Sequence, residues 1–287
     1  PVAWRIGSGH HSRSYLIEVD EYLFESPVTW YSSRDFWAVS PGFDFRKHEG
    51  FSRAAHDGCI QCHAAQVEAV KDTTHRLHII EPSIGCESCH GPGSLHIQER
   101  TSEVPLAGEF DDTIVHPGKL SRVLNEAVCA RCHLRGAGWS NVRGRSSSDF
   151  RPGLLITDFR VDFAPKDSTG SMKVVGHFEQ MHASRCYIES YTLTCTTCHN
   201  PHASPSTDMK VEHYRRKCLE CHVSKDNGCA LPEPERLAKS PADNCVTCHM
   251  PQSGTDIPHF SFTHHRIGLQ HARQVDERQV AASSELV

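Results

Sequence analysis

The chain has 287 residues, of which 38% are hydrophobic and 23% are charged, with 30 Lys and Arg against 35 Asp and Glu. The formal net charge of −5 argues against a nucleic acid as partner, because phosphate binding needs an excess of Lys and Arg. The mean hydropathy is −0.47, and no apolar run is long enough for a helix to cross a bilayer. We therefore expect no membrane span in this chain.

The first 58 residues hold 11 of the 22 aromatic side chains. Residues 14–20 and 21–24 have the composition of two β-strands around an Asp-Glu turn, which predicts a β-hairpin. Trp30, Tyr31, Phe36 and Trp37 follow it. We expect residues 1–58 to form an N-terminal segment made of a β-hairpin and an aromatic-rich arm.

From residue 59 onward, two cysteines stand three positions apart six times, each time with a histidine directly behind the second. This CxxCH pattern is typical of c-type haem attachment, in which the two thiols form thioether bonds to the porphyrin and the imidazole binds the iron. The pattern predicts six covalently bound haems c. The residues are Cys59, Cys62, His63, Cys86, Cys89, His90, Cys129, Cys132, His133, Cys195, Cys198, His199, Cys218, Cys221, His222, Cys245, Cys248 and His249.

Zinc is the alternative ligand of such cysteines. The 19 residues between Cys198 and Cys218 suit a zinc ribbon. A zinc site, however, has no need of a histidine directly after the second cysteine. Because this histidine recurs behind all six pairs, haem attachment is the favoured interpretation.

The motifs form three doublets, whose motif starts are 27, 66 and 27 residues apart. Residues 136–170 expand the middle doublet and have the composition of a loop. Short helices are expected over residues 63–72, 121–133 (with Ser121 as N-cap), 174–187 and 211–221. The fold class we expect is a mostly irregular chain with short helices wrapped around six stacked haems. Residues 59–271 then form the haem domain, and residues 272–287 a polar tail.

Two cysteines, Cys186 and Cys229, lie outside the motifs. Haem attachment to thiols takes place outside the cytoplasm, where disulfides also persist, so a Cys186–Cys229 disulfide is favoured over two separate buried thiols. We accordingly expect a periplasmic or extracellular protein. The sequence begins at Pro1 and shows no leader, so we expect upstream residues that were removed or are not included in this sequence.

Sixteen histidines lie outside the motifs, but the chain has only four methionines. Met and His both serve as the second axial ligand of haem iron, and Met raises the reduction potential. The excess of histidine predicts bis-histidine ligation, and so low potentials, at most of the six irons.

Several longer segments resemble a bacterial multihaem family in which doubled CxxCH motifs of the cytochrome c554 type are joined to tetratricopeptide repeats. One is the run Gly85-Cys-Glu-Ser-Cys-His-Gly-Pro-Gly-Ser-Leu-His96. The others are residues 7–16, 27–31, 40–43, 176–181, 198–202 and 256–267. A further haem motif upstream and helical repeats downstream are missing from this chain. It therefore resembles either a fragment or a relative whose missing parts, including an iron ligand, come from another chain.

The resemblance also implies the second iron ligands: His11, His96, His177, His202, His259 and His265. His96 and His202 closely follow a motif histidine, so we expect them to bind a neighbouring iron and thereby fasten haems together. The reserve candidates are His48, His56, His75, His78, His116 and His213.

Three functions follow from these observations. The favoured one is electron transfer along contiguous haems, without substrate chemistry, to redox partner proteins or other cytochromes. The alternative is a multihaem oxidoreductase, in which one open haem acts on a small nitrogen or sulfur compound. A third role, compatible with the first, is assembly into a homo-oligomer, a filament or a larger redox complex.

Overall fold

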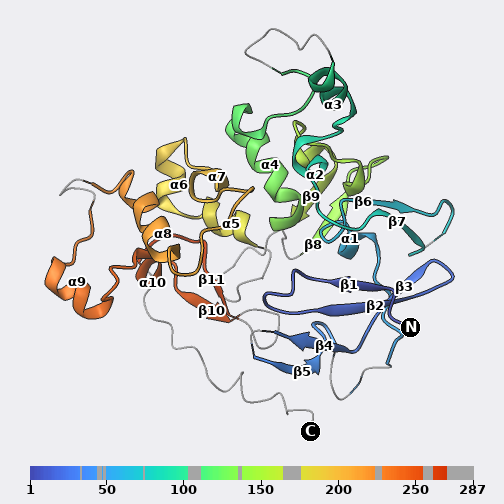
Figure 1. Cartoon of the computed structure of the whole chain (residues 1–287), viewed down its shortest axis with the longest axis horizontal. Helices are drawn as coiled ribbons and strands as arrows, with labels where there is room; N and C mark the ends of the chain where they lie inside the picture. Colours follow the sequence, from blue (N-terminus) through green and yellow to red (C-terminus); the bar gives the residue numbers. More distant parts are fainter. Residues whose placement is uncertain are drawn as a thin grey trace. The chain divides into compact units, whose positions relative to one another are not determined.

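The structure is a computed structural model. It describes residues 1–32, 34–43, 47, 50–73, 75–102, 111–134, 138–163, 176–223, 228–254 and 261–269. The chain divides into two compact units (Figure 1): unit 1 holds the described residues up to 163, and unit 2 holds those from 176 onward. Each unit contains three of the six CxxCH motifs. The tail 272–287 lies outside the described residues.

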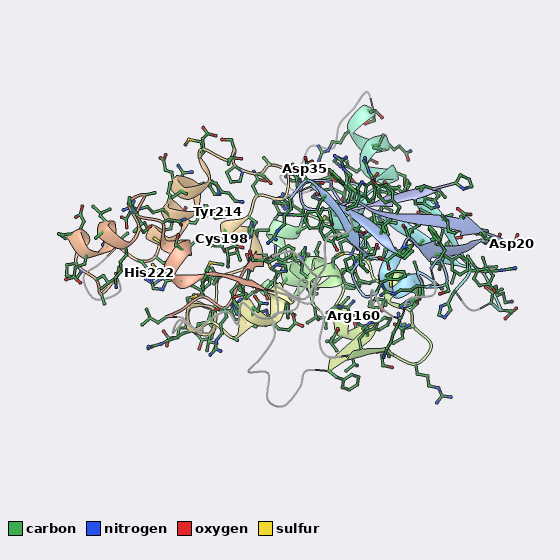
Figure 2. All side chains as sticks on the ribbon, turned by 90° about the horizontal axis from the view of Figure 1, so that it is seen from below. Asp20, Asp35, Arg160, Cys198, Tyr214 and His222 are labelled. Atoms are coloured by element: carbon green, nitrogen blue, oxygen red, sulfur yellow. The ribbon has the colours of Figure 1, made fainter. Side chains whose placement is uncertain are left out.

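Unit 1 begins with a three-stranded antiparallel sheet. Its strands, in spatial order, are β1 (Trp4–Ile6), β2 (Ser14–Val19) and β3 (Tyr22–Glu25). Pairing of Val19 with Tyr22 leaves a two-residue turn, in which Asp20 and Glu21 have φ values of 50° and 66°. Two positive φ values match the twist of a hairpin. The predicted hairpin is therefore confirmed, and Figure 2 labels Asp20 at its turn.

The aromatic-rich segment forms a second hairpin. Its strands are β4 (Val28–Tyr31) and β5 (Phe36–Val39). Trp30 and Trp37 pair across it edge to face, with their ring centroids 5.4 Å apart, and Tyr15 lies 5.7 Å from Trp37. Such aromatic pairs stabilise a sheet beyond the area they bury. An isolated bridge between Arg13 and Trp30 connects the two hairpins.

Tyr31 makes the free energy of unfolding of this region depend on pH in the alkaline range. Its side chain is fully buried, and its hydroxyl donates to the carbonyl of Val39 at 2.9 Å. Burial, followed by the charge of Glu25, raises the pKa of Tyr31 to about 12. The unfolded chain releases this proton at about pH 10. The contribution to stability is therefore fully present below that pH and is lost as the pH rises through the folded-state value.

We expect the urea unfolding midpoint, followed by circular dichroism, to fall between pH 10 and pH 12, and to fall less in Tyr31→Phe, which has no proton to lose. The other groups that titrate in this pH range are the same in both proteins, so the difference between the two pH dependences reports on Tyr31. The same pH dependence in both proteins would contradict this role for Tyr31.

The apolar core of unit 1 connects the sheet to the first CxxCH motif. The buried residues of this core cluster are Leu16, Leu23, Ala55, Ile60, Ala64 and Leu77. Ile60 lies between Cys59 and Cys62, at the end of helix α1 (Asp57–Ile60), and is 2% exposed. Burial of such a side chain contributes about 1.5–3 kcal/mol. The first motif is therefore anchored to the sheet through one of its own residues.

The helix predicted over residues 63–72 is wrong. Residues Gln66–Ala69 form strand β6, which pairs antiparallel with β7 (Leu77–Glu81). Val67 packs against the core cluster, to which the neighbouring strand contributes Leu77. This long-range packing outweighs the local preference for a helix.

The second and third motifs lie on short helices. These helices and the one between them are α2 (Glu87–His90), α3 (Ser94–Thr101) and α4 (Arg122–His133). Helix α4 confirms the prediction over residues 121–133, with Ser121 at the N-cap position but without a capping hydrogen bond from its side chain. A 3-10 turn, Pro117–Lys119, precedes α4, and the Asn125 side chain donates to the carbonyl of Pro117 at 2.9 Å. This bond fixes the start of the helix.

The segment 136–170, predicted as a loop, contains a hairpin in its described part. Its strands are β8 (Gly138–Asn141) and β9 (Arg160–Phe163), with 3-10 turns at Ser147–Asp149 and Ile156–Asp158 between them. Phe150 and Phe159 are both buried and pack edge to face, 5.9 Å between centroids. This aromatic pair closes the hairpin, which the loop-like composition of the segment does not reveal.

Unit 2 consists of short helices and one small hairpin. The elements are α5 (His177–His182), α6 (Arg185–Ser190), α7 (Cys195–Cys198), α8 (Lys210–Leu219), α9 (Glu233–Lys239), α10 (Cys245–His249), β10 (Gln252–Gly254) and β11 (Ser261–Thr263). Helix α8 confirms the prediction over residues 211–221. The helix predicted over 174–187 is instead the pair α5 and α6. The chain turns at Ser184, whose hydroxyl donates to the carbonyl of His265 and accepts from the amide of Ile267.

The described part of unit 2 has almost no apolar core. Met181 is the only buried apolar side chain among its described residues. A polar contact ties its second half together: Arg215 of α8 and Arg236 of α9 both donate to the carboxylate of Asp243, just before α10. Fixing a residue costs about 1–2 kcal/mol of backbone entropy. The described part of unit 2 therefore has little apolar burial to offset this cost.

Short helices and small antiparallel sheets make up the described chain. Short helices are present as predicted, except over residues 63–72, and strands β4 to β11 add more sheet than the predicted N-terminal hairpin alone. No helix in the part of the chain that the structure describes combines the length and apolar character needed to cross a bilayer.

Candidate haem sites

Every CxxCH motif contains a helical turn. In the second, fourth and fifth motifs, the histidine amide donates to the carbonyl of the first cysteine at 2.9, 3.0 and 3.0 Å. The third and sixth motifs lie inside α4 and α10, and in the first motif His63 donates to the carbonyl of Ile60 at 2.8 Å. Residues three and four positions apart share one face of a helical turn. The two thiols and the imidazole of each motif are therefore presented together, as attachment to one haem requires.

The two residues between the cysteines of a motif are packed differently in the two units. Each motif of unit 1 has at least one buried residue at these spacer positions. These are Ile60 and Gln61 in the first motif, Ser88 in the second and Ala130 in the third. None of the six spacer residues of unit 2, all of which are described, is buried. The motif spacers of unit 1 are thus enclosed by surrounding protein, whereas those of unit 2 are half-buried or exposed.

The three motifs of unit 1 lie close together. A hydrogen bond between the thiols of Cys62 and Cys132, followed by burial, raises the pKa of Cys132. Cys62 Sγ also lies 3.8 Å from the carbonyl oxygen of Arg131. Burial and then the charge of Cys129 raise the pKa of Cys89, which places the second motif near the third. The first, second and third motifs therefore adjoin one another.

The motifs of unit 2 adjoin one another in the same way, and Figure 2 labels Cys198 and His222 among them. Burial, and then the charge of Cys245, raises the pKa of Cys218 to about 12, and the two thiols are hydrogen-bonded. The charge of Cys198 acts on the same thiol. The fourth, fifth and sixth motifs thus form a second group of attachment points.

The ring of His90, the motif histidine of the second motif, is fixed by the backbone. Its Nδ1 lies 2.8 Å from the carbonyl oxygen of Val115. A carbonyl only accepts, so Nδ1 carries the proton and Nε2 carries the lone pair. Histidines that bind metals almost always donate their other ring N–H to such a partner. His90 therefore has the tautomer that binds iron through Nε2.

His96, a predicted second ligand, is fixed by a carboxylate. Its Nδ1 lies 2.7 Å from Oδ2 of Asp111, which also accepts two hydrogen bonds from Arg100. Hydrogen bonds from Thr113, Arg100 and His96 hold the pKa of Asp111 well below its usual range. The ionised carboxylate keeps the Nδ1 proton in place, so the lone pair of neutral His96 lies on Nε2.

Three predicted ligands of unit 2 come together around His265. Its Nδ1 lies 2.9 Å from the carbonyl oxygen of Thr263. The ring of His177 lies 4.5 Å away, and that of the motif histidine His199 lies 6.1 Å away, tilted by 27°. Two imidazoles on opposite sides of one iron, each bonded at about 2 Å, have centroids roughly 6 Å apart. The spacing of His199 and His265 fits that arrangement.

Sequence reasoning missed the residues that position these rings. Tyr214, labelled in Figure 2, places its hydroxyl 3.3 Å from Nδ1 of His199. The Gln180 side chain accepts from the amide of His265 at 2.7 Å. Gln180 lies in a segment that carries the family resemblance, which is a usable signal. Tyr214 and Asp111 have no signal in the sequence, because they act only through tertiary contacts.

The other three predicted second ligands lie in irregular segments or outside the described residues. His11 lies in the loop between β1 and β2, and His202 lies in the turn after the fourth motif, where its amide donates to the Asn200 side chain. His259 lies outside the described residues.

The reserve histidines differ from the favoured ones. His78 uses Nε2 to bind Glu21 at 2.7 Å, so its iron-binding nitrogen is occupied. Nε2 of His56 lies 3.7 Å from Sγ of Cys59, and its ring lies 5.6 Å from that of His75. His213 stacks edge to face on Tyr214. His116 immediately precedes the 3-10 turn before α4, and His48 lies outside the described residues.

Large apolar side chains stand exposed beside the motifs. Ile84, Leu95, Ile97 and Val223 are 52%, 61%, 62% and 77% exposed. Ile84 lies two residues before Cys86, and Val223 follows His222 directly. A porphyrin face is a flat apolar surface against which such side chains could pack. Together with the tautomers of the histidines, they show that the residues present fit haem.

Cys186 and Cys229 both lie in unit 2, and the disulfide between them stays a prediction. The charge of Cys221 acts on Cys186, whose pKa is raised mainly by burial, and Cys186 in turn acts on Cys198. Cys229 instead adjoins Arg236. The two thiols thus have different surroundings. Within the described ranges, no three His, Cys, Asp or Glu side chains are arranged to hold a metal ion, as the zinc ribbon would require.

Comparisons with known proteins agree with this chemistry. A family model for the doubled CXXCH motif matches residues 191–227, which hold the fourth and fifth motifs. Multiheme cytochrome MtrA of Shewanella baltica is 25% identical over 65% of this chain and 59% of MtrA. C-type polyheme cytochrome OmcB of Geobacter sulfurreducens is 24% identical over 60% of this chain and 26% of OmcB. The chain thus spans less than two thirds of the length of these relatives.

Among solved structures, the crystal structure of the outer cell wall cytochrome OcwA matches with a TM-score of 0.57 and 14% identity, over 91% of this chain and 66% of OcwA. The match shows a shared fold of short helices and small sheets. The six motifs, the match to the doubled CXXCH motif and the relatives above make the chain a multihaem c-type cytochrome. The resemblance to doubled-CxxCH cytochromes is confirmed, whereas none of these findings bears on tetratricopeptide repeats.

Proposed function

We propose that the chain transfers electrons through six covalently bound haems c, most of them with two histidine ligands. One haem is attached at each CxxCH motif, and the motif histidine binds its iron. The observation that carries this proposal is the grouping of the motif thiols, since neighbouring attachment points bring haems within contact distance. When bound, the haems supply the one-electron chemistry, and the protein sets their potentials.

The second ligands are His96 and His265 where the structure supports them best. The Nδ1 atoms of both rings are held by oxygen acceptors, which leaves the lone pair at Nε2. The ring centroids of His265 and His199 are 6.1 Å apart, which is close to the separation expected across a bis-histidine iron. The ring of His177 packs edge to face on that of His265, so His177, His199 and His265 form one group of histidines. His11, His202 and His259 remain the second ligands assigned to other irons by the family resemblance.

The cellular setting follows from the cofactor. Thioether attachment of haem takes place outside the cytoplasm, and OcwA is named for the outer cell wall. The proposal therefore places this chain in the periplasm or outside the cell. Its partners are other cytochromes or redox proteins, and a homo-oligomer, a filament or a larger redox complex is compatible with it.

Two measurements on the purified protein test the function. The intact mass should exceed that of the polypeptide by six haems, and the spectra should be those of low-spin iron in both redox states, with reversible reduction at low potential. A colourless protein that contains zinc would contradict the proposal. A haem that binds CO or nitrite in the native state has an open position, and that outcome would favour the oxidoreductase over the electron carrier.

His265 provides a site-specific prediction with a neighbouring control. His265→Ala should convert one haem from low spin to high spin, since one iron loses its second ligand, and should leave the others unchanged. His264→Ala is the control, because Nδ1 of His264 accepts from the amide of Arg266 and the ring serves the local backbone. Absorption and electron paramagnetic resonance spectra report the spin states. An unchanged spectrum in His265→Ala would remove His265 from the ligands.

A further inference from the structure

Arg160, labelled in Figure 2, is a buried cation that packs against a haem-binding motif. It begins strand β9 and is 4% exposed. Its Nη2 donates to the carbonyl of Ala130 at 3.3 Å and to that of Leu134 at 2.5 Å, and its Nη1 donates to the carbonyl of Arg131 at 3.2 Å. Ala130 and Arg131 are the two spacer residues of the third motif. The guanidinium thus holds the backbone of the haem attachment turn itself.

The same contact reaches the first motif. The carbonyl of Arg131, which accepts from Arg160, also lies 3.8 Å from Sγ of Cys62. The Arg131 side chain donates to the carbonyl of Ala65 at 3.1 Å, two residues beyond the first motif histidine. Arg160 therefore lies where the first and third motifs meet.

The positive charge of Arg160 is paired with the negative charge of the neighbouring Asp162. A guanidinium stays protonated in proteins, even when it is buried. Its Nε donates to Oδ2 of Asp162 at 2.9 Å, and Asp162 is itself 10% exposed. The other carboxylate oxygen, Oδ1, is buried and has no hydrogen-bond partner. Only Oδ2 of Asp162 accepts a hydrogen bond, and it accepts from Arg160. The ion pair therefore forms a dipole that is fixed beside the third motif.

We infer that the Arg160–Asp162 pair sets the reduction potentials of the haems at the first and third motifs. The inference rests on the proposed function, because it requires haem at these motifs. Ferric haem carries one more positive charge than ferrous haem, so a nearby cation disfavours the ferric form and raises the potential. A nearby anion does the reverse. Both effects are larger in a buried site than in water, because the effective dielectric constant is lower.

Asp162→Asn separates charge from packing. The asparagine oxygen still accepts from Nε of Arg160, but the negative charge is gone. We expect one or two of the six haems to become easier to reduce, with about a tenfold higher ratio of reduced to oxidised haem at a fixed potential, or 59 mV for a one-electron couple. Arg160→Lys keeps the charge and should leave the potentials near those of the natural protein. Arg160→Gln removes the charge and should lower them.

Arg143→Gln is the matched control, since Arg143 is an exposed cation in the same unit and solvent screens its charge. Spectroelectrochemical titration of the full chain gives the midpoints, after the haem content has been measured by mass. Unchanged midpoints in Asp162→Asn, with six haems present, would overturn the inference and leave the proposed function intact. A decrease of the midpoint potentials in Arg143→Gln as large as that in Arg160→Gln would also overturn the inference. Absence of covalent haem would defeat the proposed function and the inference with it. If Arg160→Gln does not fold, Asp162→Asn still decides.

Discussion

Without its three haems, unit 2 is expected not to fold. Replacing its six motif cysteines by alanine prevents haem attachment there. The described part of this unit buries only one apolar side chain, Met181, so the polypeptide alone cannot offset the entropy cost of ordering it. Limited proteolysis with mass spectrometry should find rapid cleavage within residues 176–254.

The matched control replaces the six motif cysteines of unit 1. That unit retains a core cluster of six buried apolar residues, so the first sheet, β1 to β3, should stay protected from protease. Equal protection of both units in the two variants would show that unit 2 has an interior of its own, contrary to the expectation.

Ile60→Ala should lower the free energy of unfolding of unit 1 by about 2–5 kcal/mol, because it leaves a cavity in the core cluster. The side chain is 2% exposed and packs with Leu16, Leu23 and Leu77. Since Ile60 lies within the first motif, the loss should also loosen the haem attached there. Urea unfolding followed by circular dichroism measures the stability, and spectra of the haem bands report the local change.

Two further variants show whether both effects have the same origin. Leu16→Ala removes a core side chain outside any motif and should cost a similar free energy without a direct effect on haem. Thr247→Ala changes an exposed spacer residue of the sixth motif and should change stability by less than about 0.5 kcal/mol. A small effect of Ile60→Ala, comparable to that of Thr247→Ala, would show that the sheet does not anchor the first motif.

The parts of the fold that follow local rules could be predicted from the sequence. The hairpin of β2 and β3 has strand-forming residues around an Asp-Glu turn, and α4 has a recognisable N-cap residue in Ser121. The failures all involve distant partners. Strand β6 was predicted as a helix because its pairing with β7 and the contact of Val67 with the core are not visible locally. The break between α5 and α6 depends on contacts of Ser184 with residues 81 and 83 positions later.

The residues of the candidate sites also fall into those that the sequence predicts and those that only tertiary contacts identify. Covalent attachment requires a fixed spacing, so the CxxCH residues can be identified without a structure. A second iron ligand can come from anywhere in the chain, and only its surroundings distinguish it. The Nδ1 acceptors of His96 and His265, and the occupied Nε2 of His78, supply that distinction here. The Arg160–Asp162 pair belongs to a segment whose composition suggested only a loop.

Because the spacer residues are packed differently in the two units, the six CxxCH motifs cannot simply be exchanged for one another. In unit 1, Ile60, Ser88 and Ala130 belong to the protein interior, so a transplanted motif must also match the cavity around it. In unit 2 the spacers Thr197, Leu219 and Val246 are half-buried and the other three are exposed, so a foreign motif meets a weaker requirement there. Exchange of motifs by recombination or redesign should therefore cost less stability among the last three positions than at the first three, and sequence drift between related chains should concentrate at the exposed spacers.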